Sequence, residues 1–160
     1  MTTALFPGSF DPFHNGHLEV VERALRLFDA VVVAVVRNPA KREPLFSLEE
    51  RIALIKTCVA TTERLSVVAM EQELTVTVAR QVGADVIVRG VRAVSDFENE
   101  LQMAQMNRQL AGVETLFVPT GSSYSFIASR LIREVARYDG DVGAFVPEPV
   151  AALMKERFGG

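Results

Sequence analysis

The chain has 160 residues, 49% of them hydrophobic, so it is long enough for a substantial core and too apolar to be disordered. Its formal net charge is -3 with both signs mixed, which argues against broad nucleic-acid binding through a basic surface. Its apolar runs are shorter than the ~20 residues of a membrane helix, the N-terminus lacks a signal-peptide pattern, and one cysteine cannot form an internal disulfide, so we expect a cytoplasmic protein.

Apolar runs that alternate with helical patterns organise the whole chain. The first run, residues 4–6, precedes a loop rich in Gly and Pro and an amphipathic stretch at 18–28. Residues 30–36 are apolar at every position, which is typical of a strand covered on both faces. Three further strands are predicted, at 65–70, 86–88 and 115–118.

Helix-start signals separate these strands. Ser47 and Glu50 have the spacing of a capping box, and so do Ser95 and Glu98. The alternation predicts an α/β fold: a Rossmann-like, doubly wound, five-stranded parallel sheet with helices on both faces. We expect a single domain over residues 1–160. The predicted helices are 18–28, 47–60, 74–82, 95–110, 125–138 and a short C-terminal one at about 148–158.

The loop at residues 6–17 carries the strongest functional signal. It follows a strand, so it should lie at the carboxyl edge of the sheet, where ligands of such folds bind. Gly8 and Gly16 allow the backbone to approach a ligand closely. A helix N-terminus presents free N–H groups to phosphate, and His14 and His17 add imidazoles there. The alternative is a tight turn with two surface histidines.

Two basic segments should lie at the same edge. The stretch Arg89-Gly90-Val91-Arg92 follows the predicted strand 86–88, and its arginines are suited to a bidentate grip on phosphate oxygens. The alternative is arginines that only solubilise a loop. Lys41 follows the strand 30–36, and its position alone does not separate a ligand from a solvated lysine.

The segment 121–130, after the strand 115–118, is rich in small hydroxyl residues. Serines that lead into a helix N-terminus form an anion cradle. The alternative is ordinary helix capping by Ser123 or Ser125. Because three polar loops would meet at one edge of the sheet, we interpret that edge as a site for phosphate-bearing ligands.

The segment His14-Asn15-Gly16-His17 is similar to the His-x-Gly-His signature of the nucleotidyltransferase superfamily. Further segments narrow the resemblance, and they stand in order over nearly the whole chain: 7–12, 38–41, 89–98, 102–108, 124–127, 134–136 and 140–142. Together they resemble the bacterial phosphopantetheine adenylyltransferases. That family transfers AMP from ATP to 4′-phosphopantetheine with Mg²⁺, giving dephospho-coenzyme A and pyrophosphate. The sequence itself shows no dedicated metal-binding residues.

The resemblance also implies roles for individual residues. His17 would stabilise the transition state as the catalytic residue, and Ser9 would meet both substrates. Lys41 and Arg89 would hold the phosphate of phosphopantetheine, and Thr75 would line its pantetheine site. The ATP-binding residues would be Ser9, Phe10, His17, Gly90, Val91, Arg92, Glu100, Tyr124, Ser125, Phe126, Ile127, Ala128, Ser129 and Arg130. A homohexamer and feedback binding of coenzyme A are further implications.

Three positions depart from the family's usual pattern. Asn99 stands where its members tend to have Tyr, Arg130 replaces the last of three serines, and His14 stands where they often have a smaller residue. Two rival interpretations stay open. One is another adenylyltransferase or a cytidylyltransferase of the superfamily, for instance one that acts on nicotinamide mononucleotide. The other is a non-catalytic nucleotide-binding domain, which would bind ATP without releasing pyrophosphate.

Overall fold

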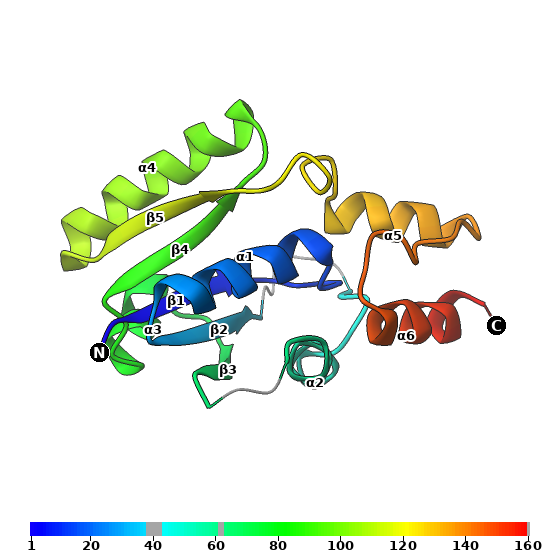
Figure 1. Cartoon of the computed structure of the whole chain (residues 1–160), viewed down its shortest axis with the longest axis horizontal. Helices are drawn as coiled ribbons and strands as arrows, with labels where there is room; N and C mark the ends of the chain where they lie inside the picture. Colours follow the sequence, from blue (N-terminus) through cyan, green and yellow to red (C-terminus); the bar gives the residue numbers. More distant parts are fainter. Residues whose placement is uncertain (38–42, 61–62, 160) are drawn as a thin grey trace.

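The computed structural model describes residues 1–37, 43–60 and 63–159, which form one five-stranded parallel sheet with the strand order β3-β2-β1-β4-β5 (Figure 1). The predicted doubly wound α/β architecture is therefore confirmed. The strands are β1 (Thr3–Gly8), β2 (Ala30–Val36), β3 (Leu65–Met70), β4 (Val86–Val91) and β5 (Glu114–Pro119). The helices are α1 (Asn15–Leu27), α2 (Leu48–Cys58), α3 (Thr75–Gln81), α4 (Val94–Ala111), α5 (Ser129–Arg137) and α6 (Glu148–Phe158).

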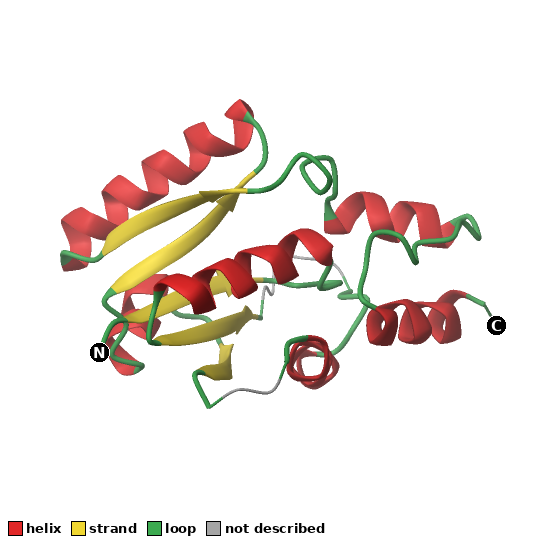
Figure 2. Ribbon diagram, in the orientation of Figure 1, coloured by secondary structure: helices red, strands yellow, loops and turns green. Residues whose placement is uncertain are grey.

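Two hydrophobic clusters lie on opposite faces of the sheet. One cluster joins α1, α2, α5 and α6 to one face, and the other joins α3 and the end of α4 to the other face (Figure 2). Strand β2 contributes to both, because Val31 and Val33 belong to the first cluster while Val32 and Ala34 belong to the second. Side chains of a strand alternate between faces, so a strand covered on both must be apolar throughout. Within the described residues, no helix is both long and apolar enough to cross a membrane.

The described strands have the fewest paired residues between β1 and β4. In the described chain, β1 pairs with β2 over six residue pairs but with β4 only at Ala4–Val86 and Leu5–Ile87. Figure 1 shows β4 and β5 diverging from β1 toward their carboxyl ends, with α4 alongside them. The strand order also reverses here, and such a switch point is where doubly wound sheets bind ligands.

Several predicted boundaries were wrong. Helix α1 begins at Asn15 instead of Leu18, because His14 is its N-cap. Strand β4 continues to Val91, so Arg89 lies on the strand and not in a loop after it. Helix α5 begins at Ser129 instead of 125, because the preceding residues turn twice before the helix starts.

One of the two predicted capping boxes is confirmed. The Glu50 N–H donates to the Ser47 hydroxyl, and the Ser47 N–H donates back to the Glu50 carboxylate. The box at Ser95 was wrong, because α4 starts after Ala93, whose extended backbone makes it the N-cap. Ser95 is already inside the first helical turn.

Candidate active site

A cavity of about 540 Å³ lies where β1 and β4 diverge. Its walls come from the end of β1, the start of α1, the end of β4, the first half of α4 and the start of α5. Many of the expected site residues line it: Ser9, Phe10, His17, Arg89, Gly90, Arg92, Glu100, Ala128, Ser129 and Arg130. His14, Asn99, Asp11, Asp96, Thr120 and Arg133 line it as well.

A second cavity, of about 300 Å³, adjoins the first along β4 and α4. Thr75 lines this cavity and not the first, together with Met103 and Asn107. Both cavities share Arg89 and Glu100 in their walls. The arrangement therefore offers room for two ligands that meet at one guanidinium group.

The remaining expected residues are placed differently. The residues that line the first cavity in the described chain do not include Val91, Tyr124, Ser125, Phe126 and Ile127. Ile127 is buried in the core, and Phe126 is exposed with its ring against Phe145. Lys41 lies outside the residues that the structure describes.

His14 and His17 form a reciprocal capping box at the start of α1. The Nδ1 atom of His14 accepts hydrogen bonds from the N–H groups of Gly16 (3.1 Å) and His17 (3.3 Å). The Nδ1 atom of His17 accepts one from the backbone N–H of His14 (3.2 Å). A ring nitrogen that accepts an N–H carries no proton, so His17 is left with its proton on Nε2 as a neutral donor.

The surroundings also hold both imidazoles neutral. Burial, His14, Arg92 and Arg89 together hold the pKa of His17 well below its usual range. Burial and, to a lesser extent, Arg92 lower the pKa of His14 to about 3. Desolvation and nearby cations both disfavour the imidazolium, so the two effects act in the same direction.

Aromatic rings fix the position of His17. Phe10 contacts it edge-on with ring centroids 4.9 Å apart, and Phe13 stacks on it at 5.6 Å. The backbone turns sharply to place Phe10, whose φ is 49°. A Cβ at Gly8 would lie 2.8 Å from the Phe10 ring, so a larger residue there would displace that ring. The Pro-Gly-Ser-Phe sequence thus builds a support for one imidazole.

Arg89 lies in the shared wall and already has partners. Its guanidinium donates to both carboxylate oxygens of Glu100, at 2.7 and 2.6 Å, and to the Pro7 carbonyl at 2.6 Å. The ion pair is half-buried. The Pro7 bond crosses from β4 to β1, so Arg89 also joins the two strands beyond their last paired residues.

Arg92 connects the start of α4 to the segment before α5. It donates to Asp96 at 3.0 Å and to the Ile127 carbonyl at 2.6 Å. The start of α5 itself faces the cavity through Ser129 and Arg130. In the part of the chain that the structure describes, no side chain caps this helix. Its first N–H groups and an exposed arginine thus give this corner of the cavity donors that suit an anion.

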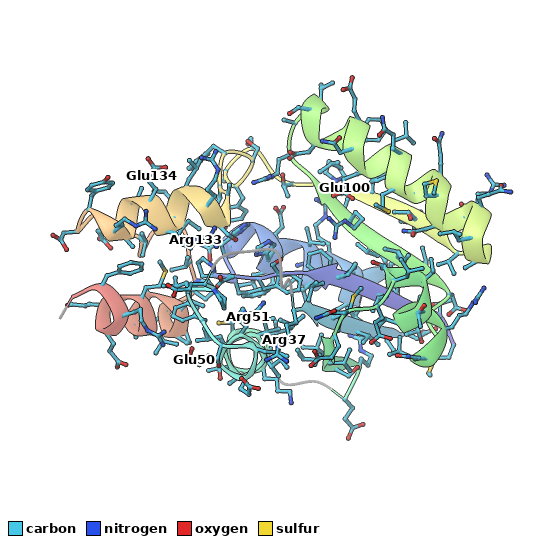
Figure 3. All side chains as sticks on the ribbon, turned by 180° about the vertical axis from the view of Figure 1, so that it is seen from behind. Arg37, Glu50, Arg51, Glu100, Arg133 and Glu134 are labelled. Carbon is cyan, nitrogen blue, oxygen red and sulfur yellow. The ribbon has the colours of Figure 1, made fainter. Side chains whose placement is uncertain are left out.

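Sequence reasoning missed a network around Asp11. The buried Asp11 carboxylate accepts the N–H groups of Leu45 and Phe46, at 2.9 and 3.0 Å. Arg133 donates to the Asp11 carbonyl at 2.6 Å, and Arg51 donates to the Ser9 carbonyl at 2.7 Å. Figure 3 labels these two arginines, which reach the first loop from α5 and α2. The partners are far apart in sequence, so no local pattern could have revealed them.

The carboxylates of the cavity are already engaged with N–H groups. Asp11 binds backbone N–H groups, Asp96 binds Arg92, and Glu100 binds Arg89. Among the described residues, no three His, Cys, Asp or Glu side chains cluster as they would to hold a metal ion. The donor set of the cavity suits phosphate oxygens.

Comparison with known proteins places this chain in a family. A family model described as cytidylyltransferase-like matches residues 5–135. A phosphopantetheine adenylyltransferase of Gloeobacter violaceus is 53% identical over 98% of this chain and 97% of its own length. Proteins of the same name from Alkaliphilus metalliredigens and Synechococcus elongatus are 47% and 50% identical, over 98% and 97% of this chain and 99% and 93% of their own lengths.

A solved structure supports the fold. The lipopolysaccharide core biosynthesis protein from Thermoplasma volcanium superposes with a TM-score of 0.57 and 22% identity, over 76% of this chain and 97% of its own. At this low identity, the similarity supports the fold alone. The extended similarity to the curated relatives carries the assignment: the chain belongs to the cytidylyltransferase-like family of nucleotidyltransferases, among the phosphopantetheine adenylyltransferases.

Proposed function

We propose that this protein transfers the adenylyl group of ATP to 4′-phosphopantetheine, giving dephospho-coenzyme A and pyrophosphate. The observation that carries the proposal is the pair of cavities that share Arg89 and Glu100. The larger one is lined by imidazole, guanidinium and helix N-terminal groups, which suit a triphosphate. The smaller one adds Met103 and Asn107, which suit a chain with amide and apolar parts.

The proposed chemistry is an in-line displacement at the α-phosphorus of ATP. The phosphate of phosphopantetheine attacks and pyrophosphate leaves, so one P–O bond forms as another breaks. The attacking oxygen is already an anion, and therefore no general base is required. The catalytic problem is electrostatic, because negative charge builds on the equatorial oxygens between two anionic substrates.

The neutral Nε2–H of His17 is suited to this problem. A fixed donor needs no reorganisation when charge develops, and its hydrogen bond strengthens in the transition state. Arg89 would hold the phosphate of phosphopantetheine, with Lys41 as a second proposed ligand. Arg92, Ser129, Arg130 and the first N–H groups of α5 would hold the triphosphate. Ser9 would meet both substrates, and Thr75 would contact the pantetheine arm.

Mg²⁺ enters this proposal as part of the substrate, bound to the phosphates of ATP. Magnesium commonly keeps several waters and takes few protein ligands. Its chemistry would be to neutralise charge on the departing pyrophosphate.

The decisive experiment is an assay of pyrophosphate release from ATP. Phosphopantetheine, nicotinamide mononucleotide and no acceptor are compared in parallel, and CTP replaces ATP in a second series because the family model is described as cytidylyltransferase-like. We expect release with ATP and phosphopantetheine. Release only with CTP or with another acceptor, or binding of ATP without release, would reject the proposal.

We also propose that the chain forms a homohexamer. Large apolar side chains are exposed on α4 and on the segment leading into and along α5: Val94, Phe97, Leu101, Met103, Met106, Leu110, Phe126, Leu131, Val135 and Tyr138. Exposed apolar surface on this scale is typical of a protein interface. Light scattering that finds a monomer at micromolar concentration would contradict it. A cytoplasmic location and feedback binding of coenzyme A complete the proposal.

A further inference from the structure

The side chain of His14 is held by the backbone at the start of α1. It is buried, and its ring lies against the His17 ring with centroids 3.5 Å apart and planes at 19°. Its Nδ1 atom accepts two backbone N–H groups at the start of α1. Each half of the capping box supports the other. The His17 ring is held by the backbone N–H of His14, and that backbone is held over the helix by the His14 ring.

We propose that His14 is a positioning residue, whose Nδ1 atom caps α1 and thereby holds His17 as the neutral Nε2–H tautomer facing the cavity. In this role His14 acts through hydrogen bonds and ring packing, and its own charge takes no part. The kinetic part of this inference rests on the proposed adenylyl transfer, whereas the tautomer itself can be observed without any reaction.

The capping role excludes a cationic role for His14. A protonated imidazole donates from both nitrogens, so it cannot accept the N–H groups of Gly16 and His17. Arg92 lies near enough to disfavour that charge as well. A phosphate contact by a charged His14 would therefore require α1 to lose its cap. The geometry favours the cap, because both bonds are made at once by one ring nitrogen.

Gly16 supports this arrangement. A Cβ at Gly16 would lie 3.0 Å from the Cε1 atom and 3.1 Å from the Nδ1 atom of His14. These distances are shorter than an ordinary van der Waals contact, so a side chain here would require the His14 ring to shift by a few tenths of an ångström. The glycine between the two histidines thus leaves space for the His14 ring and not only for a ligand.

Two substitutions of His14 distinguish its role as a helix cap from the stacking of its ring on His17. His14→Asn keeps an oxygen acceptor at a position where asparagine is a good N-cap, and His14→Phe keeps a ring that stacks but removes the acceptor. We expect His14→Asn to retain kcat within about 3-fold, because a helix cap of similar strength remains. We expect His14→Phe to lower kcat about 10- to 100-fold, as for other partners that orient a functional histidine, with both KM values little changed. Thermal unfolding confirms that each variant is folded.

Nitrogen-15 NMR of the imidazole rings tests the tautomer directly. In the wild-type protein, Nδ1 of His17 should resonate as an unprotonated nitrogen and Nε2 as a protonated one. His14→Asn should keep this pattern, whereas His14→Phe should give mixed tautomers or broad signals.

Three results would overturn the inference: a proton on Nδ1 of wild-type His17, full activity in His14→Phe, or equal loss in both variants. If His14→Phe does not fold, the wild-type and His14→Asn spectra still decide it. If the wild-type protein releases no pyrophosphate at all, the proposed reaction fails, and the spectra alone judge the role of His14.

Discussion

The two sides of the cavity are built in opposite ways. On the β1–α1 side, His14 and His17 are neutral, tightly packed and hydrogen-bonded to the backbone. On the β4–α5 side, Arg89 and Arg92 are half-buried cations paired with carboxylates, and α5 begins without a side-chain cap among the described residues. The first side offers fixed donors that need no rearrangement. The second offers charges whose present partners a phosphate can replace.

This difference has an energetic basis. Half-exposed ion pairs contribute about 0–1 kcal/mol each, so a guanidinium can exchange a carboxylate for a phosphate at small cost. A buried group that loses its hydrogen-bond partner costs about 1–3 kcal/mol, so the histidine side resists rearrangement. The comparison predicts that changes on the first side lower kcat, whereas changes on the second side raise KM.

Replacement of His17 should have the largest effect. We expect His17→Ala to lower kcat about 100- to 1000-fold, because removal of one fixed donor to a developing oxyanion typically costs that much. The fold should survive, since the ring is one contact among several in the aromatic cluster. Pyrophosphate release at saturating substrates measures the loss, and circular dichroism serves as the control. Near-normal turnover would remove His17 from the mechanism.

Replacement of Arg89 should act on binding. We expect Arg89→Met to raise the KM for phosphopantetheine about 10- to 100-fold, because a charge-assisted hydrogen bond contributes about 1.5–3 kcal/mol. Glu100→Gln is the matched control, because it weakens the ion pair but leaves the guanidinium in place. The control should change KM far less. If Arg89→Met lowered kcat and left KM unchanged, Arg89 would act like the fixed donors of the β1–α1 side.

Replacement of Arg51 should affect stability more than chemistry. The side chain is buried and donates to the carbonyls of Ser9, Val36 and Ser47. Arg51→Met removes the guanidinium donor from the Ser9 and Val36 carbonyls, whereas the Ser47 carbonyl keeps the backbone N–H of Arg51, so we expect a loss of about 1–3 kcal/mol in the free energy of unfolding. Urea unfolding monitored by circular dichroism measures it. Arg137→Met, on the exposed side of α5, is the control and should change stability little.

Replacement of Arg130 should have a smaller and salt-dependent effect. Arg130→Ser introduces a small hydroxyl and removes an exposed cation from the cavity wall where we propose that the triphosphate binds. We expect the KM for ATP to rise about 2- to 10-fold at low salt and less at high salt, because exposed charges are screened. Steady-state kinetics at two ionic strengths tests this. An unchanged KM at low salt would show that Arg130 points away from ATP.

The smallest expected effect concerns pH: neither histidine should titrate between pH 8 and pH 6. The chain has two histidines, and both imidazoles have lowered pKa values. A lowered pKa means that the proton binds only at more acidic pH, so neither ring should change charge between pH 8 and pH 6. Proton–carbon NMR of the two rings follows this directly. A ring that titrates near its usual value would be more exposed to water than the structure places it.

The sequence predicted the fold because each strand and helix carries its own signal. The apolar stretch of β2, the capping box of α2 and the glycine after α4 are local patterns with local causes. The errors arose where tertiary contacts decide. Ser95 had the spacing of a cap, but the chain had already entered the helix at Val94. Ser125 lies in a turn that positions the Ile127 carbonyl for Arg92.

The candidate site was predicted in outline for a similar reason. Its loops follow parallel strands, so the topology alone brings His17, Arg89 and Ser129 to one edge. Topology does not say which groups bind ligands and which support them. His14 was expected near phosphate, yet its ring nitrogen binds backbone N–H groups. The Asp11–Leu45 and Arg51–Ser9 contacts span more than 30 residues, so they are visible only in three dimensions.

The sparse pairing between β1 and β4 has a consequence for how binding and stability are linked. Strand β4 is paired with β1 at Ala4–Val86 and Leu5–Ile87, and hydrogen bonds between Thr3 and Asp85 and between Arg89 and Pro7 add to this junction. A ligand held by His17 on one side and Arg89 on the other would bridge this junction. We expect backbone amides of β4 to exchange with solvent faster than those of β2 in the free protein. Substrate should slow that exchange selectively, because a ligand that binds only the closed junction adds its binding energy to closure.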